Sequence, residues 1–109
     1  MSGKRKKRTA GLFRHGDVLV AAVRTIPVNA VKRPHLVLAE GELTGHAHRI
    51  AKPGSAELFQ DGADMYLRVV AEKASLIHEE HGPIALARGN YRVWRQREYS
   101  PREIRVVRD

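Results

Sequence analysis

The apolar residues of this chain fall in short runs, separated about every ten residues by turn signals of Gly, Pro, Asn or Asp. Even the longest run, Val18–Val23, is short, and no window keeps an apolar stripe at helical spacing beyond two turns. Short runs with period-two alternation are typical of β-strands. This spacing predicts an all-β fold: a small, single-domain barrel or sandwich of about eight short strands.

The strands are expected where turn signals bound apolar or alternating runs. Asp61-Gly62 predicts a hairpin after one of them, and the polar pair Glu72-Lys73 predicts a break between two others. The turn 14–17 leads into the first strand. The eight expected strands are Val18–Val23, His35–Glu40, His46–Ile50, Ala56–Phe59, Met65–Val70, Ala74–His78, Tyr91–Arg97 and Ile104–Val107.

With 109 residues, the chain has room for one core. Residues 1–12 are expected to be a disordered basic arm, and residues 13–109 a single domain. Because the core is modest, burial in a homo-oligomer or a larger assembly is possible. The chain has no cysteine, no apolar leader and no run near the roughly 20 residues that span a bilayer, so we expect a cytoplasmic protein without a membrane partner.

The net charge of +8 is concentrated at the two ends of the chain. Residues 1–14 carry six basic side chains and no acidic one, and residues 88–109 carry seven arginines against three acidic residues. Clustered positive charge favours a polyanionic partner, because it displaces counterions from phosphates. A basic tail that only aids solubility is the alternative.

Four of the six histidines lie in two short motifs, Thr44-Gly45-His46-Ala47-His48 and His78-Glu79-Glu80-His81. On a strand, His46 and His48 project from the same face, as two imidazoles that chelate one metal must. Because thiolate ligands are absent, the expected cofactor is a divalent transition metal held by His46, His48, His78 and His81, with zinc first among the candidates. Glu79 and Glu80 are candidate catalytic bases, ligands or partners of the ligands. Separate polar histidines at loop edges are the alternative.

An all-β chain with His-x-His on one strand and another histidine on a later one resembles the cupin family, over roughly residues 36–94. The resemblance implies a metal inside a small barrel, with His46 and His48 as the first pair and His78 or His81 as the distant ligand. The sequence departs from the cupin pattern at two points. Lys52 or Pro53 stands where cupins place a glutamate, and Gly82-Pro83 follows the last histidine instead of preceding it.

The segment 88–99 mixes arginines with aromatic residues. On a strand, Trp94 shares a face with Arg92 and Gln96, a combination able to stack a base and bind its phosphate, whereas Tyr91 and Val93 face the core. The alternative is an ordinary strand with one solvated face. The candidate nucleic-acid-binding residues are Lys4, Arg5, Lys6, Lys7, Arg8, Arg92, Trp94, Arg95 and Arg97.

Together these features predict a nucleic-acid-associated module with a histidine-rich metal site. RNA or single-stranded DNA is the expected partner, since no segment resembles a helix that reads the major groove. The first alternative is a small cupin-like metalloenzyme acting on a soluble substrate. The second is an interaction subunit of a larger assembly. The sequence leaves open whether the protein is an enzyme.

Overall fold

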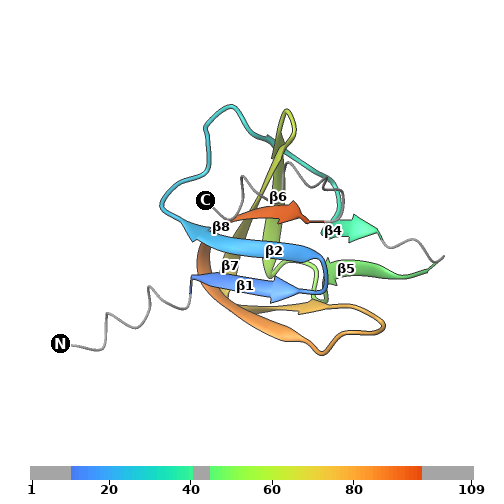
Figure 1. Cartoon of the computed structure of the whole chain (residues 1–109). Helices are drawn as coiled ribbons and strands as arrows, with labels where there is room; N and C mark the ends of the chain where they lie inside the picture. The colour runs from blue at the N-terminus through green and yellow to red at the C-terminus, as the bar shows by residue number, and fades with distance from the viewer. Residues whose placement is uncertain (1–10, 41–44, 97–109) are drawn as a thin grey trace.

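The computed structural model describes residues 11–40 and 45–96, which form eight antiparallel β-strands joined in one sheet (Figure 1). This confirms the prediction of an all-β fold with about eight strands. Among the described residues no helix is long and apolar enough to cross a membrane. The strands are β1 (Leu12–His15), β2 (Val18–Val23), β3 (Val31–Lys32), β4 (Val37–Glu40), β5 (Ala47–Ile50), β6 (Ala56–Asp61), β7 (Asp64–Ile77) and β8 (Ile84–Arg95).

The long strand β7 organises the sheet. It pairs with β8 along most of its length, with β6 over its first half and with β5 near its end. The main path runs β1-β2-β8-β7-β5-β4, while β3 pairs only with β6. Because β1 and β4 stand at opposite ends of this path, the sheet does not close into a barrel. The barrel alternative of the prediction is therefore wrong.

The two long strands differ from what the sequence predicts. The expected break at Glu72-Lys73 is a register shift between Val69 and Lys73 inside one continuous strand, so the predicted strands 65–70 and 74–78 are a single strand. Likewise, Gly89 continues β8, although the composition of residues 88–90 is typical of a turn. Its φ of 152° suits glycine, and its pairing with Val69 keeps the segment extended. The pairing of Lys73 with Ala87 and of Gly89 with Val69 holds these polar segments in the sheet despite their turn-like composition.

The core consists of side chains from β2, β4, β5, β6, β7 and β8. Tyr91 and Val93 belong to it, as the alternation of residues 91–95 predicts. Burying each large aliphatic side chain stabilises the fold by roughly 1.5–3 kcal/mol. The largest side chains with almost no exposure are Leu58, Leu67, Leu76, Leu86, Val18, Val20 and Val69.

Strand β1 includes the last residue of the expected arm. Leu12 starts β1, and Phe13 packs edge-on against Tyr91 with ring centroids 6.4 Å apart. A tight turn at Gly16 and Asp17 then joins β1 to β2. The rest of the predicted arm and the predicted strand 104–107 lie outside the described residues. The β1–β2 turn, β5 and the loop 78–83 between β7 and β8 meet, and this meeting point positions the histidines.

Candidate metal centre

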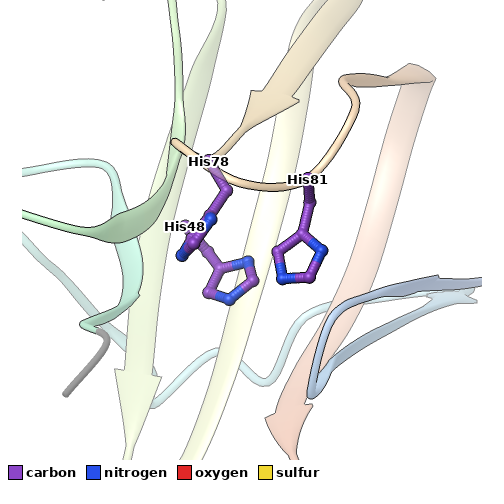
Figure 2. A group of neighbouring side chains, drawn as sticks. All are labelled: His48, His78 and His81. Atoms are coloured by element: carbon purple, nitrogen blue, oxygen red, sulfur yellow. The ribbon is translucent and has the colours of Figure 1, made fainter. Parts of the chain in front are cut away.

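Three of the predicted histidines converge on one point. His48 projects from β5, while His78 and His81 come from the loop between β7 and β8 (Figure 2). Each offers one ring nitrogen, and these nitrogens lie within 4.8 Å of one another. His48 is buried, His78 is half-buried and His81 is exposed, so the group has a solvent-facing side. This His48-His78-His81 triad could hold a metal ion.

The fourth predicted histidine, His46, lies beside the triad and shares His78 with it. The His46 and His78 ring centroids are 5.7 Å apart, and these two residues form a second possible ligand group with Glu79. His46 Nδ1 also lies 3.5 Å from a carboxylate oxygen of Glu80. The structure therefore places His46 next to His78, but in a different possible ligand group from His48.

A fifth histidine, His15 at the end of β1, also lies at the site and is not among the predicted ligands. Its Nδ1 lies 3.0 Å from His48 Nδ1, and its Nε2 lies 2.9 Å from the carbonyl oxygen of Gly82. The residue is 2% exposed, as is His48. No nearby histidine in the sequence marks His15, and only the packing of the β1–β2 turn against β5 and the loop brings it to the site.

Asp17 and Arg95 extend the cluster on the side of β2. Asp17 Oδ1 lies 3.4 Å from His48 Nε2, and Arg95 donates to Asp17 Oδ2 from two nitrogens, at 3.1 and 3.3 Å. Burial pushes the pKa of Asp17 upward, but the hydrogen bond and charge of Arg95 outweigh it and hold that pKa below its ordinary value. Asp17 therefore presents an ionised carboxylate to His48. Arg95, a predicted nucleic-acid contact, is engaged in this pair.

The two buried histidines are neutral at physiological pH. Burial is the main cause that lowers the pKa of His48 to about 4. The neighbouring imidazoles of His78 and His15 lower this pKa as well, and their effect is larger than the opposing effect of the Asp17 carboxylate. Burial also lowers the pKa of His15, against the opposing effect of its bond to Gly82. Only neutral imidazole can ligate a metal, so both rings are in the form that ligation requires.

His78 is less free to ligate than its position implies. The backbone N–H of Glu80 donates to His78 Nδ1 at 2.9 Å, which leaves the proton of the neutral ring on Nε2. A metal at Nε2 would therefore require this hydrogen bond to be given up.

Gly16 allows the close approach of the β1–β2 turn to the rings. Its φ is +67°, and a Cβ at this position would lie 2.7 Å from His81 Nε2 and 3.0 Å from His48 Cε1. A side chain here would be strained by the backbone and would also collide with two rings of the cluster.

Glu79 acts as a link between the loop and β5. Its two carboxylate oxygens accept hydrogen bonds from the backbone N–H of Ala47, at 3.0 Å, and from Arg49, at 3.1 Å. The bond from Ala47 is the main cause that lowers the pKa of Glu79 to about 2. A general base works best with a pKa near the operating pH, so this environment favours a positioning role for Glu79 over a catalytic one.

The candidate nucleic-acid contacts are only partly described. Lys4, Arg5, Lys6, Lys7, Arg8 and Arg97 lie outside the described residues. Arg92 stacks over the Trp94 ring, 5.1 Å from its centroid, and also pairs with Asp64 at 3.4 Å. One face of the only tryptophan is therefore already covered by the chain's own guanidinium group.

Comparison with protein-family models gives one match, which covers residues 14–96 and thus every strand from β2 to β8 and every clustered histidine. No curated protein and no solved structure matches the chain. The family match does not assign the chain to the cupins. On this evidence the chain belongs to the family described as "Domain of unknown function (DUF8820)".

Proposed function

We propose that this domain binds a divalent transition metal through His48, His78 and His81, with zinc first among the candidates. The observation that carries the proposal is the convergence of three imidazole nitrogens within 4.8 Å from two separate parts of the chain. Imidazole suits zinc, copper, iron and nickel, and a site without thiolates is open to each of them.

The environment of the triad supports ligation. His48 is held neutral by burial, and its Nε2 faces the Asp17 carboxylate, the type of partner that orients metal-bound histidines in proteins. His81 is exposed, so an ion has a path to the site.

The experiment is metal analysis and titration calorimetry on the full chain, with any tag removed so that stray histidines do not contribute. Wild type should bind one zinc ion per chain, and His48→Ala should lose it. His35→Ala is the matched control, since His35 is exposed and its Nδ1 accepts a hydrogen bond from the backbone of Val37. A wild type that takes up no transition metal above background would overturn the proposal.

The proposal stops at metal binding and does not extend to cupin chemistry. His46, His48 and a later histidine do match the cupin pattern, but the sheet is open and the expected glutamate is absent. In addition, a cavity of about 480 Å³ lies against β4 and β6, and none of the five clustered histidines lines it. The proposed metal therefore does not lie at this cavity.

We propose separately that the basic ends of the chain bind RNA or single-stranded DNA. Six basic residues without an acidic one in residues 1–14 support this, together with Trp94 near the second basic segment. Binding of a fluorescent oligonucleotide should weaken steeply with salt, and neutralising Lys4 to Arg8 should reduce that slope. If no oligonucleotide binds at low salt, the nucleic-acid proposal is wrong, whereas the metal-binding proposal still stands.

A further inference from the structure

We infer that His15 is a fourth metal ligand, so that the site is a closed cage of four imidazoles that ties the β1–β2 turn to β5 and to the loop between β7 and β8. This inference rests on the proposed metal site. It adds a residue outside the two sequence motifs, and it gives the metal a structural role.

The hydrogen-bond partners of His15 and His48 decide which nitrogens are free. His15 Nε2 lies 2.9 Å from the carbonyl oxygen of Gly82, which can only accept, so the ring proton is on Nε2 and the lone pair on Nδ1. His48 Nε2 lies 3.4 Å from the Asp17 carboxylate, which also only accepts. A proton on His48 Nε2 would face this carboxylate, and the lone pair would then be on Nδ1.

The two Nδ1 atoms face each other at 3.0 Å. Two lone pairs at that distance repel unless a cation lies between them. In the metal-free chain one ring must move its proton to Nδ1, away from its acceptor on the far side. A metal removes this conflict, because two nitrogens bound to zinc at about 2.0–2.1 Å with tetrahedral geometry lie about 3.3 Å apart.

The four rings also have the spacing of a tetrahedral site. In such a site a ring centroid lies about 1.2 Å beyond its ligating nitrogen, which places the centroids of two ligands about 5 Å apart. The six centroid separations among His15, His48, His78 and His81 are 5.0, 6.4, 5.6, 4.3, 5.7 and 4.7 Å. They scatter around that value, but only His48, His78 and His81 already bring one nitrogen each within 4.8 Å of the others, so His15 and the triad would have to move together to complete the cage.

Four protein ligands leave no open position for a water or a substrate, which is the pattern of structural zinc sites. The ligands come from three parts of the chain: β1, β5 and the β7–β8 loop. A metal bound there would hold the edge hairpin β1–β2 against the far end of β7. We therefore expect it to stabilise the fold, and we expect no bound water activated for hydrolysis.

The test uses the full chain with zinc, and with Co²⁺ as a probe whose visible spectrum reports ligand type and geometry. The key variant is His15→Gln. A glutamine amide can keep the hydrogen bond to Gly82, but it has no nitrogen lone pair at the position of Nδ1 to bind the metal. His35→Gln is the matched control, and His48→Ala tests the triad. Thermal unfolding with a chelator present reports whether each variant folds.

If His15 ligates, His15→Gln should unfold near the wild-type temperature without metal, but should bind zinc at least tenfold more weakly. It should also lose most of the zinc-dependent rise in unfolding temperature and change the Co²⁺ spectrum.

Unchanged zinc affinity and an unchanged Co²⁺ spectrum in His15→Gln, with metal lost in His48→Ala, would overturn the fourth ligand and leave the triad standing. A wild type without metal would overturn both proposals. If His15→Gln does not fold, the Co²⁺ spectrum of the wild type decides whether a fourth imidazole ligates. Co²⁺ with four nitrogen ligands and Co²⁺ with three and a bound water differ in the position and intensity of their absorption bands.

Discussion

Asp17 Oδ1 and His48 Nε2 lie 3.4 Å apart, and Arg95 holds the other oxygen of the same carboxylate at 3.1 Å. The β1–β2 turn thus supplies a fixed negative charge behind a buried, neutral imidazole. This is the arrangement that orients a histidine ligand and strengthens its donation to a metal.

Asp17→Asn should weaken zinc binding by about 10–100-fold, because the amide is a poorer acceptor for the His48 proton and carries no charge. Calorimetry on the purified chain measures the effect. Asp64→Asn is the control, since Asp64 also pairs with an arginine, Arg92, but is not among the residues that contact the cluster. Equal affinities for the two variants would show that Asp17 does not support the metal.

Gly16→Ala should destabilise the protein and weaken metal binding. The added Cβ would lie 2.7 Å from His81 Nε2, at a φ of +67° that alanine tolerates poorly. Gly62→Ala is a matched control, because Gly62 has a φ of +64° and nothing within 4 Å of the added Cβ. Both should lose about 1 kcal/mol from backbone strain. Gly16→Ala should lose more stability than this in urea unfolding, and of the two variants it alone should bind zinc more weakly. The same result for both variants would argue against a contact between the added Cβ and the rings.

The metal-free protein should lose stability as the pH falls from about 6.5 to about 4. Burial lowers the pKa of His48 to about 4, whereas in the unfolded chain the pKa is near 6.5, so within this window the unfolded state binds more protons. The stabilisation is fully present above pH 6.5, and up to about 3 kcal/mol of it is lost on acidification. His15, His78, His81 and Asp17 face the same ring, and the lowered pKa of His15 acts in the same direction. Urea unfolding with a chelator at several pH values measures the slope. It should flatten in His48→Gln and stay unchanged in His35→Gln.

His81→Ala should reduce zinc affinity more than His78→Ala does. Ligation through His78 Nε2 gives up the hydrogen bond from the backbone of Glu80, so its net contribution is smaller. For His81 the structure shows no such bond among the described residues. Calorimetry on the two variants compares them, and a larger loss in His78→Ala would show that the Glu80 hydrogen bond does not weaken ligation by His78.

Alternation and turn signals carried most of the fold prediction. The side chains of a strand alternate between two faces, so residues 18–23 and 91–95 could be identified as strands, with Tyr91 and Val93 in the core. Local patterns of this kind survive folding because they depend only on the geometry of neighbouring residues.

The parts that local patterns did not predict depend on contacts between distant segments. Lys73 and Gly89 have the composition of turns, yet the pairing of β7 with β8 holds them in long strands. His15 lies 33 residues from His48 and 67 from Gly82, so no spacing in the sequence marks it as part of the site. By itself the sequence predicted four of the strands (β2, β4, β5 and β6), parts of β7 and β8, and two pairs of histidines. Only the tertiary structure decided that the sheet stays open and that a fifth histidine joins them, because strand pairing and ring-to-ring contacts form between residues that the chain does not place side by side.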